Sequence, residues 1–271
     1  MGILNTTPDS FSDGGEFAES GQALDHALEM EAEGAAIIDI GGESTRPGAA
    51  EVGVEEELAR VVPVVRAFAR ARGDGTLISV DTSKAEVAEA AVAVGADVIN
   101  DVSGLCGDRR MLETAAGCGA GLVVMHMKGN PRTMQASPEY GDVVSEVREF
   151  FEERLESCDA AGIDRGRLCF DPGIGFGKSL DHNLELLRRL PELRVGDRPL
   201  LIGVSRKSFI GKLVGSDAVA DRSWGTVALT AFTTELGVEI HRVHEVRPNL
   251  EAMRMAEAIR YGAPASDPGG R

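Results

Sequence analysis

Polar side chains stand directly after the short apolar segments of this sequence, where they could share one binding site. They include Asn5, Glu43, Thr45, Arg46, Asp81, Asn100, Asp101, His126, Asp171, Lys207, Ser208, Arg242 and His244. Any one of them alone is typical of a cap or a turn. Their recurrence after eight successive apolar segments favours a shared catalytic or binding role.

These residues sort into two chemical groups. The first contains Asn5, Thr45, Arg46, Arg242 and His244, which follow the first, second and last apolar segments. It offers donors and positive charge suited to a phosphate or pyrophosphate. The second contains Asp81, Asn100, Asp171 and Lys207, a mixture of donors and acceptors that suits the edge of a polar heterocycle.

The glycine-rich segment DPGIGFGK at 171–178 is neither a P-loop nor a dinucleotide fingerprint, because the required glycine spacing is missing. Glycines such as Gly175 would instead let the backbone approach a flat ligand while Phe176 packs beside it. The segment SRKSFIGKL, from 205 to 213, begins a predicted helix near Ser208. Backbone amides at that helix start could hold a carboxylate.

Apolar segments and amphipathic segments alternate along the whole chain, and they must position these side chains. The apolar segments, rich in Val, Ile and Leu, are 2–5, 36–40, 77–80, 97–100, 121–125, 168–170, 200–204 and 241–244. Segments of this kind are typical of strands buried on both faces. Eight strand–helix pairs without a change in composition predict an α/β protein with a closed (β/α)8 TIM barrel. Catalysis in such barrels takes place at the carboxyl ends of the strands.

Helices are predicted over 23–35, 54–70, 84–96, 143–162 and 182–190, with Gly34, Gly95, Gly162 and Gly237 as helix stops. Three connections, at 6–20, 41–53 and 127–142, are too long for simple turns. Their composition suits mobile lids over the barrel mouth, although the third is equally well explained as a solvated loop.

Composition limits the classes of protein to consider. The chain has 271 residues, 43% of them hydrophobic, which predicts one barrel domain over 1–262 and a disordered tail over 263–271. No apolar run reaches the length of a membrane span and no signal pattern opens the chain, so we expect a soluble cytoplasmic protein. The net charge of −16 argues against nucleic-acid and anionic-membrane partners. The four cysteines, without a C-x-x-C pair, are predicted to be buried thiols.

Eight motifs, in order, resemble the dihydropteroate synthase family of the folate pathway, within the pterin-binding barrel group. They are MGILNTTPDSFSDGG, DIGGESTRPGA, SVDTSK, VINDVSG, VVMHMKG, FDPGIGFGK, GVSRKSFIG and RVHEV, and together they extend over nearly the whole chain. The resemblance implies condensation of p-aminobenzoate with 6-hydroxymethyl-7,8-dihydropterin diphosphate, with release of pyrophosphate assisted by Mg²⁺. It also implies a homodimer.

The family's site residues transfer to this sequence motif by motif. The resemblance implies that Asn5 ligates Mg²⁺ and the diphosphate, helped by Thr45, Arg242 and His244. It implies that Asp81, Asn100, Asp171 and Lys207 hold the pterin against Met125, and that Arg46, Pro47, Phe176 and Ser208 form the p-aminobenzoate site. One departure is Thr6, where a small apolar residue is usual in the family.

A dissociative displacement is the mechanism we expect, because an electron-rich dihydropterin can stabilise positive charge on its methylene as diphosphate leaves. Three alternatives remain at this stage. A folate-dependent methyltransferase would share the pterin site, but Arg46, the SRKS helix start and the RVH ending argue against it. An aldolase could form a Schiff base on Lys207 or Lys178. A barrel that binds a pterin or phosphate without catalysis is the third.

Overall fold

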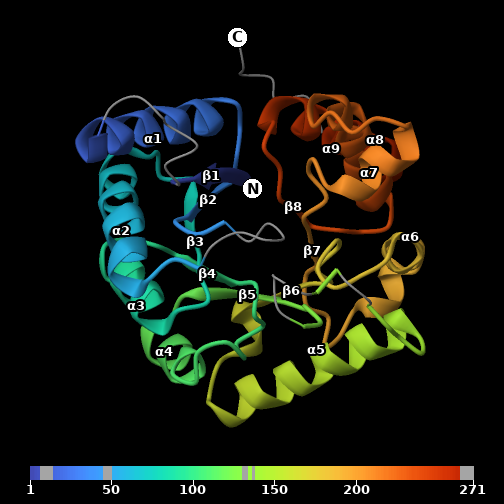
Figure 1. The fold of residues 1–271 in the computed structure, drawn as a ribbon, viewed down its shortest axis with the longest axis horizontal. Helices are drawn as coiled ribbons and strands as arrows, with labels where there is room; N and C mark the ends of the chain where they lie inside the picture. Colours follow the sequence, from blue (N-terminus) through green and yellow to red (C-terminus); the bar gives the residue numbers. More distant parts are fainter. Residues whose placement is uncertain (7–14, 45–50, 130–133, 136–137, 263–271) are drawn as a thin grey trace.

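The computed structural model describes residues 1–6, 15–44, 51–129, 134–135 and 138–262, with the side chains of 15–19 excepted. The described residues form eight strands and, around them, nine α-helices (Figure 1). The strands are β1 (Gly2–Asn5), β2 (Ile37–Gly41), β3 (Leu77–Asp81), β4 (Val98–Asp101), β5 (Gly121–Met125), β6 (Leu168–Asp171), β7 (Leu201–Ile202) and β8 (Ile240–His241). The helices are α1 (Gly15–Ala32), α2 (Val54–Ala71), α3 (Ala85–Ala93), α4 (Met111–Cys118), α5 (Val143–Ala160), α6 (Leu180–Arg188), α7 (Ser208–Val214), α8 (Ser223–Glu235) and α9 (Val246–Tyr261).

All strand pairs are parallel, in sequence order. Strands β1 to β6 form one sheet, and β7 pairs with β8 in a second. Single parallel bridges, Phe170 with Leu200 and Gly2 with Val243, join the two sheets on either side. The backbone amide of Ile3 donates to the Val243 carbonyl at 2.9 Å. The ring of strands predicted from the sequence is therefore confirmed as a TIM barrel.

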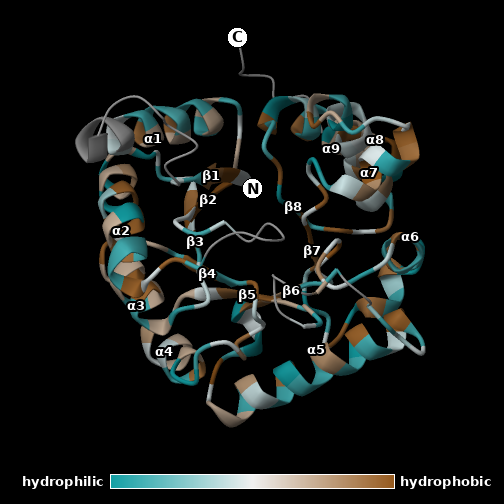
Figure 2. Ribbon diagram, in the orientation of Figure 1, coloured by the Kyte–Doolittle hydropathy of each residue, from teal (hydrophilic) through white to brown (hydrophobic). Residues whose placement is uncertain are grey.

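The core lies between the strands and the helices that surround them. On the strands, Ile38, Ile78 and Ile99 are fully buried, and Val61 and Phe68 of α2 are buried against the same core. Apolar residues three and four apart put these side chains on one side of α2. Figure 2 shows the corresponding mixture of apolar and polar residues along each helix, α5 for example.

The strand limits agree with the apolar segments to within one or two residues for β1 to β6. Strands β7 and β8 are shorter than predicted, and β8 ends at His241, so Arg242 and His244 follow the strand. Gly34, Gly95, Gly162 and Gly237 all have positive φ, as expected of helix stops. Two helices, α7 and α8, separate β7 from β8.

The prediction of four buried thiols was wrong in part. Cys158 and Cys169 are buried, but Cys106 is exposed and Cys118 is half-buried. Cys106 lies in the loop after β4, where the Arg154 guanidinium donates to its sulfur at 3.2 Å. A connecting loop on the surface cannot bury its side chains as a strand does. All four thiols are free.

Two further expectations concern the chain as a whole. The last helix ends at Tyr261, and the predicted tail over 263–271 lies outside the described residues. Within the described part of the chain, no helix combines the length and apolar character needed to cross a membrane.

Candidate active site

Four residues lie side by side in one row at the carboxyl ends of neighbouring strands. Asn5 pairs with Gly41, Gly41 with Asp81, and Asp81 with Asn100 in the register of β1 to β4. A Cβ added at Gly41 would lie 3.3 Å from the Asp81 Cβ, so glycine leaves room for the carboxylate beside it. Parallel pairing thus brings polar side chains from distant sequence segments to one end of the barrel.

An ion-pair network connects this row to the last strand. Arg242 donates through Nε to Asp39 Oδ2 at 2.5 Å and through Nη2 to Asp81 Oδ2 at 2.7 Å. Asn100 donates to the same Asp39 oxygen at 3.1 Å. Asp39 is completely buried. Its carboxylate therefore holds an arginine from beyond β8 and an asparagine from β4 in fixed positions.

Burial sets the protonation of these groups. It raises the pKa of Asp81 to about 7, although the Arg242 guanidinium opposes the shift. Burial acts to lower the pKa of Arg242, but Asp39 and Asp81 outweigh it and raise that pKa above its usual range. Arg242 is therefore a permanent cation between two carboxyl groups, one of which can take up a proton near neutral pH.

Asp171, Phe176 and Lys207 form the opposite side of the mouth. Asp171 ends β6 and pairs with Met125 of β5, and burial raises the pKa of its carboxyl group. The Lys207 ammonium lies 3.8 Å from the centre of the Phe176 ring. Burial lowers the pKa of Lys207 to about 8, and the Asp171 carboxylate opposes that shift. The charged groups of Asp171 and Lys207 and the face of the Phe176 ring thus line the same side of the barrel mouth.

The glycine loop after β6 packs backbone to backbone against the loop after β5. A Cβ at Gly173 would lie 2.0 Å from the His126 carbonyl oxygen, and one at Gly177 would lie 2.2 Å from that of Lys128. Gly175 has φ +84, and a Cβ there would lie 3.2 Å from Lys207 Cδ. The glycines therefore allow close packing against neighbouring protein atoms, including Lys207, while their approach to a flat ligand stays a prediction.

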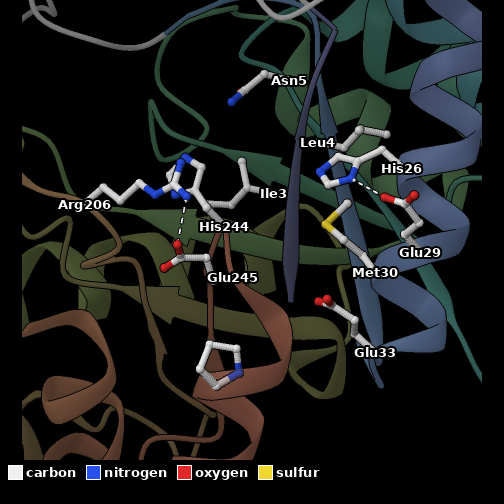
Figure 3. A pocket seen from close by; sticks show the side chains of 11 residues that line it. Ile3, Leu4, Asn5, His26, Glu29, Met30, Glu33, Arg206, His244 and Glu245 are labelled. Carbon is white, nitrogen blue, oxygen red and sulfur yellow. Dashed lines mark hydrogen bonds and ion pairs between the residues drawn. The ribbon is translucent and has the colours of Figure 1, made fainter. Parts of the chain in front are cut away.

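His244 is held in place by Ser205. The Ser205 hydroxyl lies 2.9 Å from His244 Nδ1 and accepts a hydrogen bond from the His244 backbone amide at 3.1 Å. Asn5 and His244 both line a cavity of about 760 Å³ between β1, α1 and the start of α9 (Figure 3). Arg206 also lines it and pairs with Glu245 at 3.1 Å. Donors from the end of β1 and from the segments after β7 and β8 therefore line the same cavity.

The two predicted groups of residues meet in space. Arg242, assigned to the phosphate group, bonds directly to Asp81 of the heterocycle group. Ser208 begins α7 as expected. Three predicted residues, Thr45, Arg46 and Pro47, lie outside the described residues.

Two buried polar residues near the mouth, Asp39 and Asn183, were not identified from the sequence, and Lys178 was considered only as a Schiff-base lysine. Asp39 lies inside an apolar strand, and a charge in such a segment was the available signal. Lys178 is 2% exposed and lies beside His126, and Asn183 accepts from the Gly175 amide at 2.7 Å. Nothing in the spacing of Lys178 or Asn183 separates them from surface residues.

The chain matches one protein family over most of its length. Residues 1–244 match the model of the family described as pterin binding enzyme. The chain is 51% identical to dihydropteroate synthase of Escherichia coli (strain K12), over 95% of this chain and 90% of that protein.

Two solved structures are similar over almost the whole chain. A Yersinia pestis dihydropteroate synthase with a sulfonamide drug complex is 49% identical, with a TM-score of 0.90, over 96% of this chain and 93% of that one. A Xanthomonas albilineans dihydropteroate synthase in complex with 7,8-dihydropteroate is 42% identical, with a TM-score of 0.86 and the same coverage. The chain belongs to the dihydropteroate synthases of the pterin-binding enzyme family.

Proposed function

We propose that this chain condenses 6-hydroxymethyl-7,8-dihydropterin diphosphate with p-aminobenzoate to give 7,8-dihydropteroate and pyrophosphate. The proposal rests on the buried donors and acceptors at the ends of β3, β4 and β6, namely Asp81, Asn100 and Asp171. Lys207 and Arg242 complete this set. A relative with the same fold binds the product, 7,8-dihydropteroate. The chain is thus a transferase of folate synthesis rather than a methyltransferase or an aldolase.

Asp81, Asn100, Asp171 and Lys207 are assigned to the pterin. A pterin edge offers ring N–H and amino donors beside a carbonyl and ring-nitrogen acceptors. Carboxylates match the donors, while an amide and an ammonium match the acceptors. All four groups lie at the mouth, where low polarity strengthens each hydrogen bond. Met125, which is 3% exposed beside Asp171, is assigned to the face of the ring.

Asn5, Arg242 and His244 are assigned to the diphosphate, with Thr45 from outside the described residues. Within the described residues no three His, Cys, Asp or Glu side chains form a metal cluster. Mg²⁺ commonly binds through few protein ligands and completes its coordination with substrate phosphates and water. The amide oxygen of Asn5 fits that mode, so Asn5 is assigned as the protein ligand. A bound Mg²⁺ would neutralise charge on the departing diphosphate.

The chain's own residues then act mainly by electrostatics. Arg242, fixed by Asp39, and His244, fixed by Ser205, stabilise negative charge on the leaving group. The Asp171 carboxylate stabilises positive charge that develops on the pterin as the methylene carbon–oxygen bond breaks. The arylamine nitrogen attacks that methylene and then loses its proton. No covalent bond to the protein is needed.

The p-aminobenzoate site is assigned to Phe176 and Ser208, together with Arg46 and Pro47. The Phe176 ring provides an aromatic face next to Lys207. Ser208 is exposed at the first turn of α7, where free amides can receive a carboxylate.

Pyrophosphate release tests this function directly. The purified chain with pterin diphosphate, p-aminobenzoate and Mg²⁺ is expected to release pyrophosphate, and chelation by EDTA is expected to abolish release until Mg²⁺ is restored. Asp171→Ala and Lys207→Ala are expected to lose most activity while they keep the parent's far-ultraviolet circular dichroism. Full activity in both variants would disprove the pterin assignment.

A homodimer is part of the proposal. On α8, Trp224 is 81% exposed and Phe232 47%, and on α9, Ile259 is 77% exposed and Met255 63%. These two helices pack against one another. Large apolar side chains gathered on adjacent helices favour a protein interface. A cytoplasmic location stays a prediction.

A further inference from the structure

Lys178 is a buried lysine that the proposed reaction does not use. Its side chain, 2% exposed, lies below the glycine loop that follows β6. Its Nζ lies 2.9 Å from His126 Nδ1, 3.3 Å from the His126 carbonyl oxygen and 2.9 Å from the Phe176 carbonyl oxygen. An ammonium group has three donors, so these three acceptors match it completely.

The partner histidine is suited to accept. Burial and the nearby Lys178 lower the pKa of His126 to about 3, so its ring is neutral at physiological pH. A neutral imidazole with its proton on Nε2 presents the Nδ1 lone pair to the ammonium. His126 is itself fixed by the Phe150 ring, whose centre is 5.1 Å away at a nearly perpendicular angle. Lys178 is therefore attached to a rigid part of the barrel.

The loop that Lys178 holds is the one that presents Phe176. Lys178 binds the Phe176 carbonyl directly, and the Phe176 ring lies under the Lys207 ammonium. Further contacts hold the residues on either side of Phe176: Asn183 accepts from the Gly175 amide at 2.7 Å, and Tyr140 donates to the Gly177 carbonyl at 2.9 Å.

We propose that Lys178 is a positioning residue, whose ammonium joins the loop after β5 to the glycine loop and thereby sets Phe176 in the arylamine site. This inference rests on the proposed function, because it needs Phe176 to face p-aminobenzoate.

Steady-state kinetics of Lys178→Ala provide the first test. We expect kcat/KM for p-aminobenzoate to fall by about 100-fold, the scale of a small misplacement, with a much smaller change in KM for pterin diphosphate. Lys212→Met, on the exposed face of α7, is the matched control and should behave as the parent. Equal kcat/KM in Lys178→Ala and Lys212→Met would overturn the proposal.

Chemical rescue separates positioning from general loss of structure. Propylammonium replaces the deleted chain and its three donors, whereas tetramethylammonium carries the charge without a donor. Recovery of Lys178→Ala with propylammonium alone is expected. Recovery with both cations, or with neither, counts against the hydrogen-bonded contact.

Two variants of the histidine keep the test decisive if Lys178→Ala does not fold. In His126→Asn the amide oxygen can occupy the place of Nδ1, while His126→Leu has no acceptor. His126→Asn is expected to keep most of the parent's kcat/KM and His126→Leu to lose it. Equal loss in both contradicts the assignment.

Amide hydrogen exchange tests the contact without catalysis. The loop amides of Gly173, Gly175 and Phe176 all donate hydrogen bonds, to Asp171, Asn183 and the Gly173 carbonyl respectively. They should exchange faster in Lys178→Ala than in Lys212→Met, and unchanged exchange would refute the contact. If the parent chain releases no pyrophosphate, the proposed function fails, while this measurement still reports on Lys178.

Discussion

Arg242 and Asp81 are 161 positions apart in the sequence, yet their side chains bond at 2.7 Å across the barrel mouth. The same guanidinium reaches Asp39 at 2.5 Å. Arg242 follows the short strand β8, and the neighbouring Val243 forms the isolated bridge with Gly2 that joins this part of the chain to the six-stranded sheet. These two ion pairs therefore connect the segment after β8 to β2 and β3, in addition to its backbone bridge with β1.

Asp39→Asn tests that connection. Loss of one partner leaves the Arg242 charge incompletely paired, so we expect the free energy of unfolding to fall by about 3 kcal/mol and kcat to fall with it. Urea denaturation and pyrophosphate release measure the two effects. Asp25→Asn, exposed on α1, makes the same chemical change as a control. The idea fails if the two variants are equally stable.

The raised pKa of Asp81 predicts that the stability of the fold depends on pH. Burial raises its pKa from 3.8 to about 7, so between these values the folded chain holds a proton that the unfolded chain has released. The contribution of Asp81 to stability therefore decreases as pH rises from about 4 to 7. Relative to the parent, Asp81→Asn should gain stability across this range, seen in urea midpoints at pH 5 and 7.5. A constant difference between variant and parent would contradict the shift.

Gly173→Ala and Gly119→Ala form a matched pair. Both glycines have left-handed backbones, with φ +64 and +74, so alanine costs about 1 kcal/mol at either position. At Gly119 a Cβ meets nothing within 4 Å, whereas at Gly173 it would lie 2.0 Å from the His126 carbonyl oxygen. We expect Gly173→Ala to cost about 2 kcal/mol more, measured by thermal unfolding. Similar losses would show that the two loops can separate freely.

Trp224→Arg tests the proposed homodimer. A charge in place of this highly exposed apolar side chain, in the first turn of α8, should convert the dimer to a monomer, detectable by sedimentation velocity. Leu77→Arg, at an exposed position at the start of β3, serves as the control. An unchanged sedimentation coefficient in Trp224→Arg would place any dimer interface elsewhere.

The barrel was readable from the sequence because strands buried on both faces appear as uninterrupted apolar runs. The lengths of β7 and β8 were overestimated, because the predicted segments extend beyond the two residues of each strand that form regular pairs. Even so, the Arg242 amide still donates to the Ile202 carbonyl at 2.9 Å. Pairing thus continues beyond the strand, and Arg242 is held where the longer prediction would have put it.

Asp39 could not be identified from its neighbours in sequence. Its position follows from register: Gly41, on the same face of β2, pairs with Asp81, so Asp39 lies one layer deeper than the mouth. Similarly, the acceptors around Lys178 come from loops about fifty positions apart. Such networks depend on strand register and loop packing, which a local pattern does not encode.

The predicted ligand-binding residues come from both sheets of the barrel, which are joined by single backbone bridges. Lys207 and Arg242 follow the strands of the two-stranded sheet, while Asp81, Asn100 and Asp171 lie at the ends of strands in the six-stranded one. A ligand that contacts both sets of residues adds interactions between the two sheets, which are joined on each side by one isolated backbone bridge. Bound substrate therefore stabilises the contact between the two sheets. Saturation with ligand should slow the opening of β7 and β8 more than that of β2 and β3.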